Sequence, residues 1–151
     1  MAFIYYAGPV DFALFDGQDV LAPVRKRLTE QNHAIYNATT VFEAGRVDRM
    51  GKATISTVID IHSSAIRACD AVLADLRGQS VGIPIELMAA TQERKPAFVL
   101  VSERTKNSLY IHHITTHTLG AMSEDPDELN DRLFDLVGFD GEAPHPKENS
   151  Y

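Results

Sequence analysis

Short apolar segments alternate along this chain with segments of helical period, and this alternation restricts the fold more than any other feature. Residues 97–101 form an uninterrupted apolar run, which is typical of a strand buried on both faces. Strand-like segments also occupy residues 3–6, 33–37 and 70–75. Strands that alternate with helices predict an α/β fold of the flavodoxin or Rossmann type. We expect a doubly wound parallel sheet of four to five strands with helices on both faces.

Helical spacing of apolar residues recurs at residues 19–31, 54–69, 82–94 and 127–137. Residues 102–120 remain ambiguous between helix and loop, and residues 41–52 predict a loop or a short helix. We expect one domain over residues 1–138 and a flexible C-terminal tail over residues 139–151, which are rich in Pro, Gly, Glu and Lys.

Length and charge exclude several classes of protein. The 151 residues carry 14 basic and 21 acidic side chains, a net charge of −7, and a duplex-binding protein needs a basic face. We therefore expect no polymeric nucleic acid as a partner. No apolar run approaches the roughly 20 residues of a membrane helix. The N-terminus lacks the features of a secretory signal, and the single cysteine, Cys69, excludes a disulfide framework, so a cytoplasmic location fits.

The stretch DLRGQSVGIPIE, residues 75–86, contains the most informative polar residues. Ligands of open α/β sheets bind at the carboxyl ends of the strands, where this stretch emerges. Ser80 can cap the following helix, whose first N–H groups can hold an anion. Glu86 has apolar neighbours, and a carboxylate there is costly without a partner or a task. The pattern alone leaves open that Glu86 is a surface residue and Ser80 an ordinary N-cap.

Other chemical motifs are weak. His113 and His117 have the i, i+4 spacing that metals use, but no Glu follows His113 and no Cys lies close, so we expect a polar loop and no metal. Neither a G-x-G-x-x-G sequence nor a P-loop is present, which disfavours a dinucleotide or nucleoside triphosphate site.

Four motifs taken in order resemble one enzyme family. They are Tyr-x-Ala-Gly-Pro, Cys-Asp-Ala-Val-Leu-Ala-Asp, Ser-Val-Gly-Ile-Pro-Ile-Glu-Leu-x-x-Ala and Lys-Pro-Ala-Phe-Val-Leu-Val. This set resembles the nucleoside 2-deoxyribosyltransferase family, which includes 2′-deoxynucleoside 5′-phosphate N-hydrolases and cytidylate N-hydrolases. The resemblance covers most of residues 3–137.

The resemblance implies a retaining N-glycosidase. Glu86 stands at the nucleophile position, where a carboxylate attacks the anomeric carbon and expels the base. Tyr6 would line the pocket and hold either that carboxylate or the sugar. The other residues that the resemblance or their place in the chain assigns to substrate binding are Gly8, Pro9, Phe12, Asp75 and Gly82.

The resemblance also points to a nucleotide substrate. Ser80 replaces the acid of the transferases and can donate to a 5′-phosphate, and Ser108 resembles a serine that a neighbouring subunit contributes. Either His62 or Asp60 would serve as the acid that helps the base to leave. We expect no cofactor and a homodimer or higher oligomer with shared active sites. Base exchange between deoxynucleosides and a non-catalytic nucleotide-binding module remain the alternatives.

Overall fold

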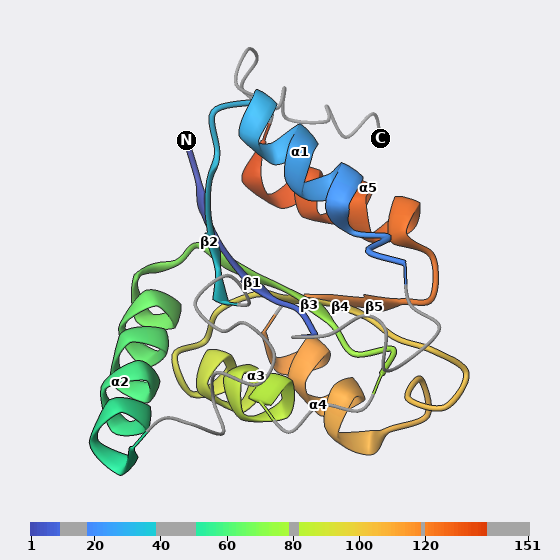
Figure 1. Ribbon diagram of the computed structural model, residues 1–151. Coiled ribbons are helices and arrows are strands. Elements are labelled where there is room, and N and C mark those ends of the chain that lie inside the picture. The colour runs from blue at the N-terminus through green and yellow to red at the C-terminus, as the bar shows by residue number, and fades with distance from the viewer. Residues whose placement is uncertain (10–17, 39–50, 79–81, 119, 139–151) are drawn as a thin grey trace, which may run out of the picture.

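A computed structural model describes residues 1–9, 18–38, 51–78, 82–118 and 120–138. Within these ranges the chain forms an alternating series of strands and helices (Figure 1). The strands are β1 (Phe3–Ala7), β2 (Ala34–Asn37), β3 (Ala71–Asp75), β4 (Ala97–Leu100) and β5 (Ala121–Ser123). The helices are α1 (Ala22–Glu30), α2 (Lys52–Ala68), α3 (Gly82–Gln92), α4 (Leu109–His117) and α5 (Pro126–Val137).

The strands form one parallel sheet in the order β2-β1-β3-β4-β5, which confirms the expected fold class. Tyr5 of β1 lies opposite Tyr36 of β2 and Val72 of β3. The chain leaves β1 toward one edge of the sheet and returns to the other side of β1 as β3. This order places the topological switch point, where α/β folds bind ligands, between β1 and β3.

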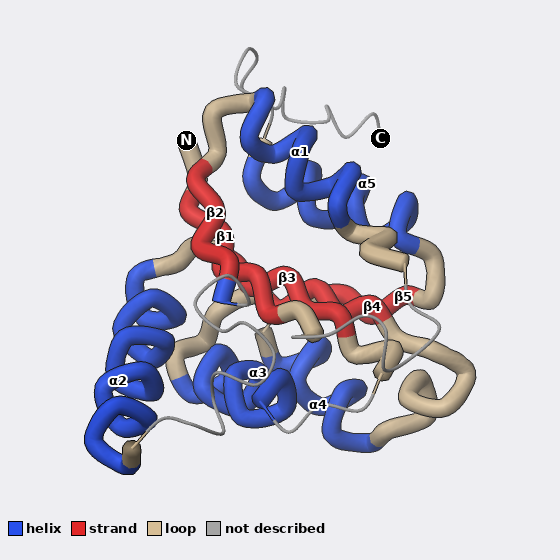
Figure 2. The backbone as a smooth tube through the Cα atoms, in the orientation of Figure 1, coloured by secondary structure: helices blue, strands red, loops and turns tan. Residues whose placement is uncertain are grey.

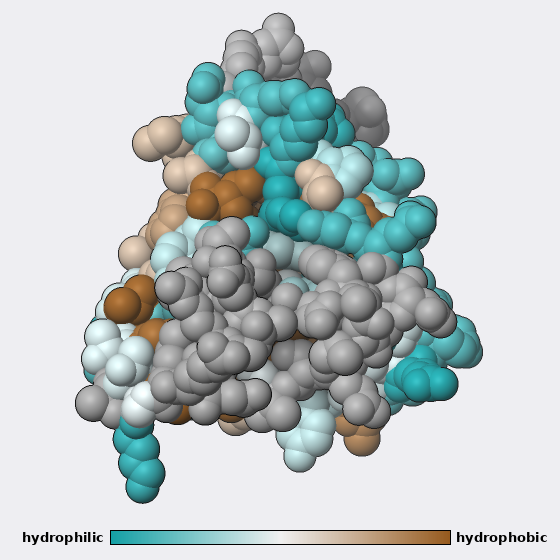
Figure 3. All heavy atoms as spheres, viewed as in Figure 1, coloured by the Kyte–Doolittle hydropathy of each residue, from teal (hydrophilic) through white to brown (hydrophobic). Residues whose placement is uncertain are grey.

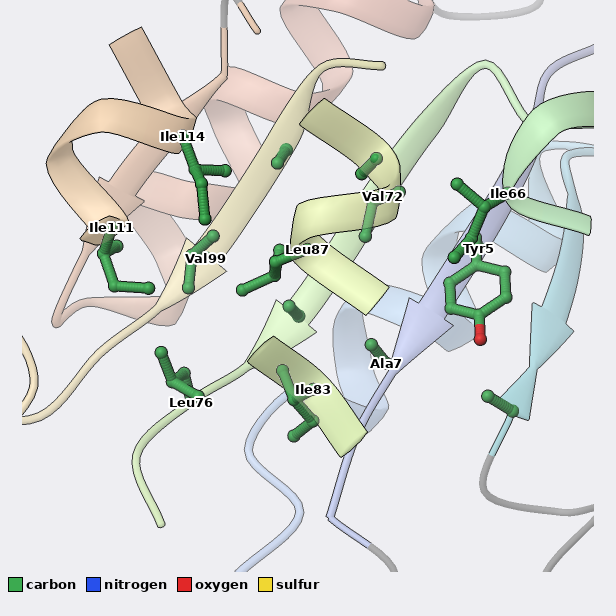
Figure 4. Close-up of a cluster of buried hydrophobic side chains, with 14 of the residues drawn as sticks. Tyr5, Ala7, Ile66, Val72, Leu76, Ile83, Leu87, Val99, Ile111 and Ile114 are labelled. Carbon is green, nitrogen blue, oxygen red and sulfur yellow. The ribbon is translucent and has the colours of Figure 1, made fainter. Parts of the chain in front are cut away.

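Helices lie on both faces of the sheet (Figures 1 and 2), and an apolar layer lies between helices and sheet on each face. Helices α1 and α5 cover one face, where Leu28 and Phe134 pack with Ile4 and Leu73 of the strands. Helices α2, α3 and α4 cover the other face. The cluster there includes Tyr5, Ile66, Leu87 and Ile114 and is drawn in Figure 4. Because both faces are covered, the central strands are apolar without alternation.

The segment between β4 and β5 is helical, which corrects the expected polar loop around His113 and His117. Ile111 and Ile114 of α4 are buried against the sheet. The hydroxyl of Thr115 donates to the Ile111 carbonyl at 2.9 Å, four residues earlier. Threonine side chains often favour loops, but a threonine hydroxyl that donates to a carbonyl of its own helix has its hydrogen bond satisfied there. Burial of one apolar stripe therefore outweighs the low helix propensity of the threonines.

Strand β5 has no clear signal in the sequence because it is only three residues long. It pairs beside β4 at a point where Gly120 approaches the backbone closely. A Cβ atom on Gly120 would lie 1.8 Å from the Ala97 carbonyl oxygen, so only glycine permits this approach. The tail over residues 139–151 and the segment 41–50 lie outside the described residues. Among the helices that the structure describes, none is both long and apolar enough to cross a membrane.

Candidate active site

Glu86 is held at the centre of a cluster to which four elements contribute. It lies about one turn into α3, which begins at the carboxyl edge of the sheet. The Tyr5 hydroxyl of β1 donates a hydrogen bond of 2.8 Å to Glu86 Oε1. The His62 Nδ1 of α2 lies 3.2 Å from the same oxygen. The side chains of His62 and Glu86 are only 13% and 14% exposed, so the carboxylate is largely withdrawn from water.

Aromatic rings surround this carboxylate. The rings of Tyr5 and Tyr36 stack with centroids 5.3 Å apart. The His62 ring meets both edge-on, at 6.1 Å from Tyr5 and 5.8 Å from Tyr36. Figure 4 shows the Tyr5 side chain with its oxygen on the side away from Ile66. This packing fixes the orientation of the Tyr5 ring, whose hydroxyl donates to Glu86.

Burial keeps both tyrosines protonated. Desolvation, followed by the charge of Glu86 and the hydrogen bond to it, raises the pKa of Tyr5 far above its ordinary value. Desolvation and the charge of Glu86 also raise the pKa of Tyr36. Tyr5 therefore remains a donor to Glu86 throughout the neutral and alkaline range.

Tyr6 lies on the opposite face of the sheet from Glu86. Successive side chains of a strand point to opposite faces, so Tyr5 faces α2 and α3 while Tyr6 faces α1. The Arg25 guanidinium lies 4.2 Å from the centroid of the Tyr6 ring. A Cβ atom on Gly8 would lie 2.5 Å from the Tyr6 hydroxyl oxygen, so the glycine leaves room for that ring. Tyr5 thus occupies the place beside Glu86 that the sequence analysis gave to Tyr6.

Asp75 is buried in an ion pair at the end of β3. Its side chain is fully buried, and Arg77 donates to it from Nε at 2.9 Å and from Nη2 at 2.7 Å. The same Nη2 also donates to the Gln18 carbonyl oxygen at 2.9 Å. This pair joins the segment that follows β3 to the segment that precedes α1. The ion pair with Arg77 therefore gives Asp75 a structural role close to the switch point between β1 and β3.

The remaining predicted residues are spread along the carboxyl edge. Asp60 is exposed on α2, whereas His62 points toward Glu86, because two residues on a helix differ in direction by about 200°. Pro9 is buried after β1. Gly82 is exposed at the start of α3. Ser108 precedes α4, and its side chain makes no capping hydrogen bond. Two predicted residues, Phe12 and Ser80, lie outside the described residues.

The described part of the chain holds no group of three or more His, Cys, Asp or Glu side chains able to hold a metal ion. The His113 and His117 rings lie 3.9 Å apart on α4. The Nδ1 atom of His117 is 2.9 Å from the His113 carbonyl oxygen and bonds to it.

The fold is shared with solved enzymes. No family model and no curated protein matches the sequence. The CMP N-glycosidase BcmB of Clostridium botulinum matches with a TM-score of 0.58 and 15% identity, over 87% of this chain and 97% of that one. A 2-deoxyribosyltransferase of Bacillus psychrosaccharolyticus matches with a TM-score of 0.60 and 19% identity, over 91% and 97%. A conserved protein of Enterococcus faecalis V583 matches with a TM-score of 0.62 and 15% identity, over 89% and 98%. At these identities the likeness establishes the α/β fold.

Proposed function

We propose that this protein is an enzyme, an N-glycosidase that hydrolyses the bond between base and sugar in a (deoxy)nucleoside 5′-monophosphate. The products are the free base and (deoxy)ribose 5-phosphate. The observation that carries the proposal is the Glu86 carboxylate, partly buried and held by Tyr5 at the edge of the sheet where such folds bind ligands. Two of the solved proteins with this fold are named for cleavage or exchange of the same kind of bond.

The reaction proceeds in two balanced steps. Glu86 attacks C1′, and the electron pair of the C1′–N bond passes to the base, which takes a proton. A glycosyl ester on Glu86 results. Water then attacks C1′ and loses a proton, while the ester bond returns its electron pair to the carboxylate. The second product leaves with the water oxygen, and the released proton balances the one that the base took up. The scheme needs no metal or organic cofactor, because the carboxylate is the nucleophile and hydrogen-bond donors orient it.

Two serines support the proposal that the substrate carries a phosphate. Ser80 stands six residues before Glu86 and carries a hydroxyl that can donate to phosphate, where a carboxylate would repel it. Ser108 lies at the start of α4, which follows the carboxyl end of β4. We assign Ser80 to the phosphate of its own subunit's substrate and Ser108 to that of a neighbouring subunit. Gly8, Pro9 and Gly82 would border the sugar.

A panel of substrates tests the proposed reaction. The purified protein is incubated with ribo- and deoxynucleosides and their 5′-monophosphates, each with and without a second base, and the products are separated by chromatography. We expect free base from monophosphates without an acceptor base. Products that form only when an acceptor is added would establish base exchange instead. Binding of nucleotides with no product under any condition would indicate a binding module and contradict the proposal.

We further propose that the protein acts as a homodimer. Helices α2, α3 and α4 leave several large apolar side chains exposed on their outer surface, and some reach the surface over α2 in Figure 3. They are Ile55, Ile59, Ile61, Ile85, Met88, Leu109 and Tyr110. Exposed apolar groups of this kind are typical of association surfaces. A second copy on this surface would also bring Ser108 next to another subunit.

The dimer proposal predicts a mass near twice 16.7 kDa by light scattering during gel filtration. The Ile59→Glu variant should shift the mass toward that of the monomer, because a buried charge in an apolar interface is costly. The Lys26→Glu variant changes an exposed residue of α1, on the other face of the sheet. It serves as the control and should leave the mass unchanged. A monomeric wild-type protein would contradict both the dimer and the shared role of Ser108.

A further inference from the structure

The two contacts that hold Glu86 fall on one of its oxygens. Tyr5 donates to Oε1, and His62 Nδ1 lies 3.2 Å from the same atom. Among the described residues, no contact of this kind reaches Oε2. The two oxygens of the carboxylate are therefore in different environments before any substrate binds.

We propose that His62 is a positioning residue for the nucleophile and not the acid that protonates the departing base. In this arrangement Tyr5 and His62 hold Oε1, and Oε2 forms the bond to C1′. The departing base takes its proton from water. This inference rests on the proposed function and assigns roles to individual atoms within it.

The state of the His62 ring follows from its neighbours. A carboxylate oxygen only accepts hydrogen bonds, and a ring-nitrogen lone pair at 3.2 Å from Oε1 would be repelled, so the contact favours the form of the ring that carries hydrogen on Nδ1. Loss of that proton to a base would leave a nitrogen lone pair facing the carboxylate oxygen. A base that took this hydrogen would therefore have to replace the contact between Nδ1 and Oε1.

The other ring nitrogen is also badly placed for an acid. The His62 Nε2 atom is buried, so a base could reach it only after neighbouring groups moved. Among the described residues, the groups that face the ring include Tyr5 from β1, Tyr36 from β2 and Glu86 from α3. The raised pKa values of both tyrosines keep them neutral, which leaves Glu86 as the charged neighbour among them. The His62 ring is thus packed between the two tyrosines and the carboxylate.

Two substitutions at His62 distinguish the roles. In His62→Asn the side-chain amide places an N–H close to the position of Nδ1, whereas His62→Leu removes the donor. A misplaced nucleophile costs on the order of 100-fold, so we expect the leucine variant to lose about that much in kcat/KM and the asparagine variant to recover at least about tenfold of it. The loss should be the same for every base. His112→Asn, an exposed position on α4, should not change the rate.

An acid at His62 would give a different pattern. Neither variant could then transfer a proton, both would lose about 10²–10⁴-fold, and the loss would shrink for bases that leave readily without protonation. That pattern would overturn the inference.

A second measurement does not depend on activity. In ¹⁵N-labelled protein, the His62 Nδ1 signal should be that of a protonated nitrogen and should move in Glu86→Gln but not in Glu93→Gln. The positioning role would be overturned if Nδ1 were unprotonated, or if its signal did not change in Glu86→Gln. Both outcomes can be observed even if no substrate is turned over. Failure of the substrate panel with the expected spectrum would instead reject the proposed function alone.

Discussion

We expect the Glu86→Gln variant to fold like the wild-type protein and to release base at a rate lower by about 10³-fold or more. Glutamine has the same shape, and its amide oxygen can still accept the hydrogen bond from Tyr5. The amide cannot form the glycosyl ester, so the route through a covalent intermediate is closed. A loss of 10³-fold corresponds to about 4 kcal/mol of lost transition-state stabilisation.

The measurement is the rate of base release at saturating nucleotide, together with nucleotide affinity and the thermal unfolding midpoint. Glu93→Gln is the matched control, because Glu93 follows the same helix but pairs with the exposed Arg67 on the surface. Exposed pairs contribute about 0–1 kcal/mol, so this variant should keep both its rate and its stability. A Glu86→Gln variant with the wild-type rate would reject the carboxylate as nucleophile.

Trapping of the intermediate gives an independent check. Acid quench during the wild-type reaction, followed by mass spectrometry, should find a peptide that contains Glu86 with the added mass of the sugar phosphate. The same peptide in Glu86→Gln should remain unmodified. An adduct on another residue would move the nucleophile elsewhere in the chain.

The sequence was sufficient to predict the fold, because the signals for it are strong and local. The apolar run that contains β4 and the helical stripes around it agree with one another, and a parallel sheet is the arrangement that satisfies both. Strand β5 and helix α4 were harder to identify. The strand has three residues, and the helix owes its stability to burial of Ile111 and Ile114, which a local pattern rich in threonine does not reveal.

Within the site, Glu86 could be predicted and its partner on β1 could not. A carboxylate between apolar residues is a visible anomaly in a sequence. Tyr5 and Tyr6 are adjacent, and both are buried because helices cover both faces of the sheet. A strand of this kind has no polar alternation to show which tyrosine faces which layer. Only the pairing of the strand and the packing of the helices identify Tyr5 as the donor.

The position of His62 relative to Asp60 was within reach of sequence reasoning. Ile66 is buried, and a residue four positions earlier on a helix lies on the same face. His62 satisfies that spacing and Asp60 does not. This spacing is hard to see in the sequence because the helix also carries isoleucines on its exposed faces, which conceal the buried side.

The ion pair between Arg77 and Asp75 carries the largest expected effect on stability. We expect Arg77→Met to lower the free energy of unfolding by about 3 kcal/mol, because it leaves a buried carboxylate without its countercharge. The Asp75 side chain is fully buried, and Arg77 is 20% exposed, so water cannot replace the lost guanidinium at the carboxylate. Hydrogen bonds to Asp75 also raise the pKa of Arg77, so the native pair stays charged.

Urea denaturation of three variants measures the effect. Asp75→Asn combined with Arg77→Met should recover much of the loss, because the buried charge is then absent. Arg67→Met removes an exposed partner of Glu93 and should cost less than about 1 kcal/mol. A deficit as small as that of Arg67→Met, or one that is unchanged in the double variant, would show that the pair does not hold the segments after β3 and before α1 together.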